Sequence, residues 1–249
     1  MPRLLLSDEL WLKLRIILLQ FGVYDKRNLR KMVEGMFYRL RTGLPWRDLP
    51  EYFGSWNAVY KKFNNWSAKG IWRKVLDFLV DDPDLEWGFI DGSYVRAHQH
   101  SAGASGGGCQ AVGPSRGGNT SKIHLVVDGF GLPVHFEITG GQIHDSSAAD
   151  SVLDNSPVFD FTVADKGYDK EELREKLRRK NSVPVIPRKS NSKIGNGDID
   201  WHLYKIRHLV ENQFARLKHY RAIATRYDKL KRNFESMVAM ACVFQWLPM

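Results

Sequence analysis

The pattern of apolar residues changes once along this chain, at the turn-forming stretch Asp-Asp-Pro-Asp of residues 81–84. Before that stretch, apolar residues recur at spacings of three and four, which is the period of an α-helix. After it, short apolar runs of strand length alternate with helical patterns. The chain therefore predicts a helical N-terminal domain over residues 1–82 and an α/β domain over residues 83–249.

The N-terminal domain has the features of a helix-turn-helix-like bundle. Its third helical pattern, over residues 56–66, carries Asn57, Lys61 and Lys62 among its polar positions. Amide and ammonium side chains on a short helix can contact base edges and phosphates in a DNA major groove. The alternative interpretation is a small bundle whose polar face is only solvated, and the pattern does not separate the two.

The second domain alternates strands and helices. Strand character covers residues 87–92, 122–127, 134–138, 161–165 and 183–186, and helical patterns cover residues 146–153, 169–180 and the chain from about 203 onward. The glycine-rich residues 101–118 predict a flexible loop, and the polar residues 189–200 predict a second, exposed loop. The glycine-rich loop is no P-loop, because no Gly-Lys-Ser/Thr closes it.

Two of the predicted strands end in a carboxylate. Asp91 follows one apolar run and Asp165 follows another. Neighbouring strands that both end in aspartate bring two negative charges together, which is costly unless a cation lies between them. Taken singly, each aspartate can instead cap a turn or a helix.

A third acid lies in the helical pattern of residues 204–218. At about 100° per residue, Tyr204, Arg207, Glu211 and Lys218 fall on one narrow stripe, separate from the apolar face. Such a helix can bury its apolar side and direct a carboxylate and cations at one site. The alternative is a solvated stripe with an i,i+4 ion pair between Arg207 and Glu211.

Charge favours a polyanionic partner. The formal net charge is +9 and the sequence pI is near 9.5. The segment 207–232 concentrates cations, among them Arg216 and Arg221, between tyrosines, which suits a surface that follows a DNA backbone. A basic enzyme with no nucleic-acid partner, or a solvated helix face, remains the alternative.

Cysteine usage and apolar run lengths bear on the cellular compartment. Cys109 and Cys242 form no C-x-x-C pair, so we expect neither a disulfide framework nor a cysteine zinc site. The apolar runs at residues 4–6 and 237–247 are too short for a signal peptide or a membrane span. These observations predict a cytoplasmic protein with no membrane partner.

Several segments of the chain, taken together in their order, resemble those of one known family. The spacing Tyr204, two residues, Arg207, three residues, Glu211, six residues, Lys218 resembles the signature of insertion-sequence transposases of the DDE type, and the likeness is to the IS5 family. Further segments that look like those of the family are residues 42–50, 89–93, 139–145 and 163–169. The resemblance covers nearly the whole chain.

The resemblance implies a fold and a chemistry. The fold is RNase H-like, a mixed sheet flanked by helices, and the catalytic acids come from a strand, a later strand and a helix. The matching positions here are Asp91, Asp165 and Glu211, accompanied by Tyr204, Arg207 and Lys218 as DNA-contacting residues. These acids would hold two Mg²⁺ ions, for which Mn²⁺ can substitute, and would act on double-stranded DNA: the element's terminal inverted repeats and the target.

Joining two element ends calls for two active sites, so we expect a homodimer on DNA. Two other functions stay open: an RNase H-like metal-dependent nuclease that cuts without joining, and a catalytically silent, sequence-specific DNA-binding protein. A metabolic enzyme with incidental basic charge has no cofactor fingerprint to support it.

Overall fold

The computed structural model of the chain describes residues 2–101 and 109–249, which fall into two compact units. The first, here called the helical unit, comprises Met1–Asp81, Ala97–Gln110 and Leu217–Met249. The second, the sheet unit, comprises Asp82–Arg96 and Ala111–Arg216. The chain thus contributes three segments to the helical unit and two to the sheet unit.

Helices build the helical unit, and their bounds follow local sequence signals. They are α1 (Asp8–Gln20), α2 (Leu29–Thr42), α3 (Trp56–Ala68), α4 (Ile71–Leu79), α9 (Arg221–Ala224) and α10 (Lys231–Trp246), with the 3-10 turns η1 (Trp46–Asp48), η2 (Glu51–Phe53) and η3 (Gln99–Ser101) and the short strand β7 (Thr225–Arg226). The Ser7 hydroxyl caps α1 by accepting the Leu10 amide at 3.2 Å. Gly43, at φ 68°, ends α2 in the left-handed conformation that glycine adopts at low cost.

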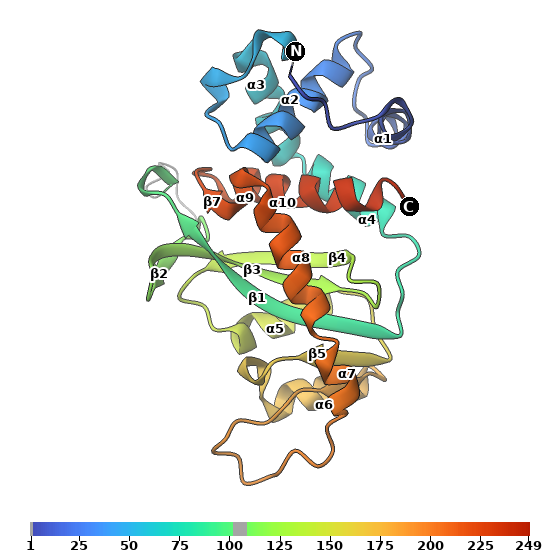
Figure 1. Cartoon of the computed structure of the whole chain (residues 1–249), viewed down its shortest axis with the longest axis vertical. Helices are drawn as coiled ribbons and strands as arrows, with labels where there is room; N and C mark the ends of the chain where they lie inside the picture. Colours follow the sequence, from blue (N-terminus) through green and yellow to red (C-terminus); the bar gives the residue numbers. More distant parts are fainter. Residues whose placement is uncertain (1, 102–108) are drawn as a thin grey trace. The chain divides into compact units, whose positions relative to one another are not determined.

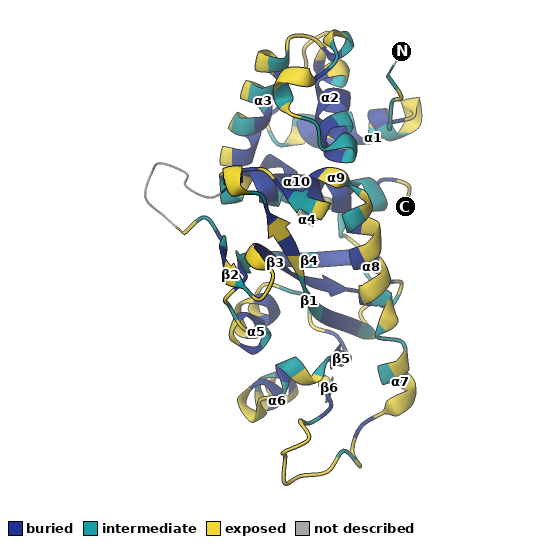
Figure 2. Cartoon of the chain, turned by 60° about the vertical axis from the view of Figure 1, so that its left-hand side comes forward, coloured by how far each residue is buried: buried dark blue, intermediate teal, exposed yellow. Residues whose placement is uncertain are grey.

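The C-terminal helix belongs to this helical unit, which corrects the expected division at residues 82/83. α10 is buried along most of its length (Figure 2) and packs against α3 and α4. A helix that is apolar on nearly all sides needs neighbours on all sides, and α10 finds them among the N-terminal helices. The rings of Phe37 and Trp72 meet edge to face in the same core, with centroids 5.7 Å apart.

The sheet unit contains a mixed sheet. Its strands are β1 (Trp87–Ala97), β2 (Gly113–Ser115), β3 (Gly118–Val127), β4 (Pro133–Gly140), β5 (Phe161–Ala164) and β6 (Val183–Val185). β3 pairs antiparallel with β1 and with β4, whereas β1 pairs parallel with β5 and β5 parallel with β6. The expected RNase H-like mixed sheet is confirmed, with an antiparallel part and a parallel part that share β1 (Figure 1).

Helices flank this sheet. They are α5 (Asp145–Asp154), α6 (Glu171–Arg179), α7 (Trp201–Lys205) and α8 (His208–His219), with the 3-10 turn η4 (Lys166–Tyr168) after β5. α5 packs on β3 and β4, and α6 packs on β6. Figures 1 and 2 together show α8 and α5 on opposite faces of the sheet. Both apolar faces of the sheet are therefore covered.

Three expectations need correction. β1 does not end at Asp91 but continues to Ala97, because β3 pairs with it as far as Arg96↔Thr120. The predicted loop 101–118 is shorter, since Gly113–Ser115 pairs with Gly118–Thr120 as a hairpin; residues 102–108 lie outside the described part. Finally, residues 204–218 are not one helix.

The break in that helix falls between Lys205 and His208. The Ile206 and Arg207 amides donate to carbonyls only three residues back, at 3.0 and 3.1 Å, which closes turns in place of the α-helical bonds. Arg207 reaches Asp91 on β1 from this turn. This tertiary contact accounts for a break that the local periodicity does not signal.

Candidate active site

Asp91 and Asp165 occupy equivalent places on neighbouring parallel strands. The β1–β5 ladder ends with the pair Ile90↔Ala164, and the next residue on each strand is the aspartate. Carboxylates at the same end of adjacent parallel strands open on the same edge of the sheet. The structure thus brings together the two acids that the sequence pattern predicted would be neighbours.

Each aspartate accepts one backbone hydrogen bond. The Gly92 amide donates to Asp91 Oδ1 at 2.7 Å, and the Gly167 amide donates to Asp165 Oδ1 at 2.8 Å. These bonds orient the carboxylates and leave the second oxygen of each open to other partners.

Glu211 joins the strand acids through Arg207. Arg207 Nη1 donates to Asp91 Oδ2 at 3.0 Å, while Nη2 forms an ion pair with Glu211 Oε1. The ion pair between Arg207 and Glu211 thus forms although the predicted helix is interrupted. Glu211 lies in the first turn of α8 with its side chain 53% exposed.

The electrostatics of this cluster favour a cation. Burial raises the pKa of Asp91, and the nearby Asp165 raises it further, against the lowering effects of the Gly92 amide and Arg207. Burial alone would lower the pKa of Arg207, but Asp91 and Glu211 raise it overall. One guanidinium thus serves a cluster that holds three carboxylates.

Tyr168 is a buried neighbour of these acids that the sequence analysis assigned no role. It is 1% exposed, and its hydroxyl has no hydrogen-bond partner among the described residues. Burial, with the charges of Asp145, Asp91 and Asp165, raises the pKa of this phenol well above its usual value. Tyr168 therefore stays neutral and keeps a proton to donate.

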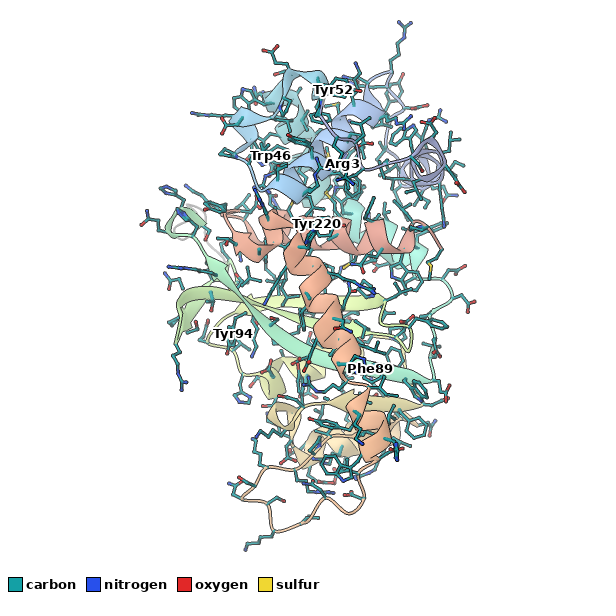
Figure 3. All side chains as sticks on the ribbon, in the orientation of Figure 1. Arg3, Trp46, Tyr52, Phe89, Tyr94 and Tyr220 are labelled. Carbon is teal, nitrogen blue, oxygen red and sulfur yellow. The ribbon has the colours of Figure 1, made fainter. Side chains whose placement is uncertain are left out.

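A second polar cluster supports the backbone beside Asp91. Lys122 Nζ on β3 pairs with Asp145 Oδ2 at 2.6 Å, and the lysine lies 4.6 Å from the centre of the Tyr94 ring. Figure 3 marks Tyr94 and Phe89 on β1, which flank Asp91 in sequence. A Cβ on Gly92 would lie 2.1 Å from Asp145 Oδ1, so a larger residue there would displace the Asp145 carboxylate. The one sequence signal was the family-like segment 139–145, which carried no assigned role.

His124 belongs to the same cluster. Its Nε2 lies 2.8 Å from the Thr139 hydroxyl and its Nδ1 lies 3.5 Å from Asp145 Oδ1. Burial lowers the pKa of His124 to about 4, outweighing the opposite effect of Asp145. The imidazole is therefore neutral near pH 7, and its contact with Asp145 is not an ion pair.

The acids fit a hard divalent cation by donor type, since carboxylate oxygens are the ligands that Mg²⁺ and Mn²⁺ prefer. Within residues 2–101 and 109–249, no three acid, histidine or cysteine side chains already converge as a metal cage. The reason is visible in the contacts: Arg207 stands between Asp91 and Glu211. Among the acids of this cluster, Asp91, Asp165 and Glu211 offer oxygen donors of the type that such an ion takes.

The predicted DNA-contacting residues divide between the units. In the sheet unit, Tyr204 is half-buried beside Arg207, whose guanidinium lies 6.0 Å from its ring, and Arg216 is exposed on α8. Lys218, seven residues beyond Glu211 along α8, and the exposed Arg221 fall in the helical unit.

The α3 residues form part of a basic surface of the helical unit. Asn57 and Lys61 are exposed, and Lys62 lies 5.6 Å from the Trp66 ring. Burial and the neighbouring cations Lys26 and Lys69 lower the pKa of Lys62. Three ammonium groups therefore lie close enough to influence one another at α3, and clustered cations of this kind favour a polyanionic ligand.

Comparison with known proteins agrees with this geometry. Residues 6–76 match the family model described as a putative transposase of the IS4/5 family, and residues 83–246 match the transposase DDE domain. The chain is 37% identical over 132 residues to a putative transposase for insertion sequence element IS6501 of Brucella ovis, covering 51% of this chain and 98% of that protein. It is 29% identical over 133 residues to a putative transposase for IS402 of Burkholderia cepacia, covering 49% and 60%.

Among solved structures, the chain aligns with a pre-cleavage Mos1 transpososome at a TM-score of 0.30 and 9% identity, over 90% of this chain and 79% of that one. No helix in the described ranges has the length and apolarity needed to cross a membrane. The resemblance to insertion-sequence transposases is confirmed by the two family models, which together span most of the chain.

Proposed function

Because the chain belongs to the family of transposases that share the DDE domain, we propose that it cuts DNA at the ends of an insertion sequence to free 3′-OH groups and joins these ends to target DNA. The observation that carries the proposal is the placement of Asp91 and Asp165 directly after the last paired residues of two parallel strands, with Glu211 tied to Asp91 through Arg207.

The residues of the chain have distinct tasks in this scheme. Asp91, Asp165 and Glu211 would hold two Mg²⁺ ions, with Mn²⁺ able to replace them. Bound divalent ions lower the pKa of the attacking water or 3′-OH and stabilise the departing oxygen. The Gly92 and Gly167 amides keep two of the carboxylates oriented. Arg207, once released from Glu211, can donate to a DNA phosphate as a planar fork.

DNA binding is shared by the two units. We assign element-end recognition to Asn57, Lys61 and Lys62 on α3, and backbone contacts to Tyr204, Arg216, Lys218 and Arg221. The substrate is double-stranded DNA, both the terminal inverted repeats and the target. Since two ends react together, we expect a homodimer on DNA that works in the cytoplasm at the chromosome.

The test is cleavage and joining of a labelled element end in Mg²⁺ by the wild type and by Glu211→Ala. The control is Asn212→Ala, which changes the adjacent exposed residue of α8. We expect Glu211→Ala to lose both reactions while it still binds DNA, and Asn212→Ala to keep them. Cleavage without joining by the wild type would instead identify a nuclease, and DNA binding without metal-dependent cleavage would identify a silent DNA-binding protein.

A further inference from the structure

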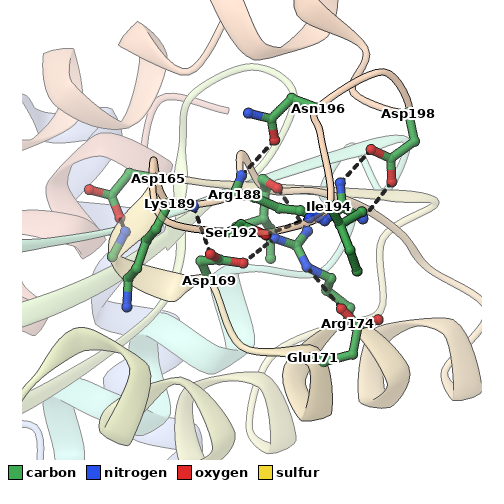
Figure 4. Close-up of polar contacts among 12 residues, drawn as sticks. Asp165, Asp169, Glu171, Arg174, Arg188, Lys189, Ser192, Ile194, Asn196 and Asp198 are labelled. Carbon is green, nitrogen blue, oxygen red and sulfur yellow. Dashed lines mark hydrogen bonds and ion pairs between the residues drawn. The ribbon is translucent and has the colours of Figure 1, made fainter.

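An open cavity of about 550 Å³ lies beside Asp165 in the sheet unit. One side of it is formed by Asp165, Lys166 and Gly167 at the end of β5. The other side is formed by Lys189, Ser190 and Asn191, from the loop that follows β6. Figure 4 shows Lys189 next to Asp165. Of the lining residues, only Asp165 and Gly167 have a role in the chemistry proposed above.

The loop that carries Lys189 is anchored by ionic contacts at both of its ends. Asp169 Oδ2 accepts the Lys189 amide at 2.7 Å, and Asp169 Oδ1 accepts Arg174 Nη2 at 2.6 Å. Arg174 is 1% exposed and also donates to the Ile186 carbonyl at 2.7 Å. Arg188, the residue before Lys189, pairs with Asp198 near the other end of the loop (Figure 4). These contacts fix the Lys189 backbone next to η4 although the loop has no regular structure.

The anchoring leaves the two cavity ammonium groups available. Lys166 and Lys189 are exposed, and neither forms a salt bridge with an acid of the described residues. Although burial acts in the opposite direction, the Lys189 amide and Arg174 hold the pKa of Asp169 below its usual value. Asp169 therefore stays ionised at neutral pH. The charge of Lys189 also helps to lower this pKa, but its ammonium group forms no salt bridge with Asp169 within the described ranges.

We propose that this cavity is a phosphate-binding subsite that holds the DNA backbone next to the phosphodiester being cut. Two ammonium groups with a serine hydroxyl and an asparagine amide suit an anionic, oxygen-rich ligand, and the cavity is open, as a strand that enters and leaves requires. Lys189 is the principal contact and Asp169 is the positioning residue that sets its place. The assignment rests on the proposed function.

The experiment compares Lys189→Ala with Lys193→Ala, an exposed lysine of the same loop that does not line the cavity. Binding of a fluorescent DNA duplex is measured against salt concentration. A phosphate contact contributes about 0.9 to the slope of log K against log salt, so Lys189→Ala should lose about that amount and Lys193→Ala should keep the wild-type slope. Lys189→Arg should restore the slope, because the charge returns.

Cleavage of a labelled element end separates this inference from the proposed function. We expect Lys189→Ala to cleave more slowly than Lys193→Ala in the same Mg²⁺ buffer. Equal slopes and equal cleavage rates for these two variants, beside an active wild type, overturn the subsite. A wild type that binds DNA without cutting it refutes the proposed function, and the slope comparison then still decides whether the cavity binds phosphate.

Discussion

Two arginines, one in each unit, show how differently the chain treats its charges. In the helical unit, Arg39 pairs with Asp228, with Nη1–Oδ2 and Nη2–Oδ1 distances of 3.2 Å, and both side chains are about 95% buried. In the sheet unit, Arg207 is shared between Asp91 and Glu211, with Asp165 close to Asp91. The first arrangement holds a single carboxylate, with the charge of the buried Arg226 also close to it, whereas the second has an excess of acid.

This difference separates a structural ion pair from a binding site. A buried pair without excess acid offers no spare carboxylate to a cation, and removal of one partner leaves the other charge uncompensated. Carboxylates held close together repel one another and lower the stability of the fold. A bound cation can offset this loss. Loss of an acid should therefore have opposite effects on stability and activity in the two units.

The largest effect is expected from Asp91→Asn. Loss of this carboxylate should lower the cleavage rate by about a thousandfold or more, because charge stabilisation by a bound metal supplies several kcal/mol. The unfolding midpoint should stay close to that of the wild type, since a like charge beside Asp165 is removed. Single-turnover cleavage and urea unfolding measure the two effects. Strong destabilisation with normal cleavage would mean that Asp91 is a structural residue and not a metal-binding one.

Asp228→Ala should behave in the opposite way. It leaves Arg39 buried without its partner, which costs about 3–5 kcal/mol of unfolding free energy. Asp25→Ala is the control, because it removes the acid of the exposed pair between Arg15 and Asp25 and should cause no measurable change. Urea unfolding distinguishes these variants, and equal stability of both would mean that the buried pair is not structural.

A smaller effect depends on pH and on His124. Its pKa of about 4 in the folded chain lies below the ordinary value of 6.5. The stability that comes from burying the neutral ring is thus complete above pH 6.5 and is lost as the pH falls toward 4. Between pH 7 and pH 5 this should cost about 2 kcal/mol. Urea unfolding at both pH values should show a smaller loss in His124→Gln, and an equal loss would exclude His124 as the source.

The smallest effect is expected on the helical unit's DNA surface. Lys61→Ala should reduce the slope of log K against log salt by about 0.9, as one lost phosphate contact. At saturating DNA its cleavage rate should equal that of the wild type, because the proposed catalytic acids lie in the sheet unit and Lys61 lies in the helical unit. A reduced rate at saturation would show that α3 also acts in the chemical step.

The position of the two strand acids could be predicted from the sequence. Asp91 and Asp165 each follow an apolar run, and parallel pairing with a register of Ile90↔Ala164 is enough to make them neighbours. The course of β1 beyond Asp91 was not predicted, because the residues from Gly92 onward lose the apolar run and only their pairing with β3 extends the strand. Strand ends set by a partner cannot be read from local periodicity.

The parts that local sequence missed depend on contacts between distant residues. The break at Ile206–Arg207 accompanies the contact of Arg207 with Asp91, 116 positions away. Lys122 and Asp145 are 23 positions apart and pair across different elements. The packing of α10 among the N-terminal helices likewise depends on which apolar helix faces contact one another. Periodicity predicts that such faces are buried, but it does not predict which helix or strand covers them.

The most direct test of the central claim, that Asp165 holds a divalent metal in the cutting reaction, is cleavage of a labelled element end by Asp165→Cys in Mg²⁺ and in Mn²⁺. A thiolate suits the softer Mn²⁺ better than Mg²⁺. The account predicts no cleavage in Mg²⁺ and recovered cleavage in Mn²⁺, with no such metal dependence for Asp160→Cys, an exposed position just before β5. Cleavage by Asp165→Cys in Mg²⁺ at the wild-type rate would contradict it.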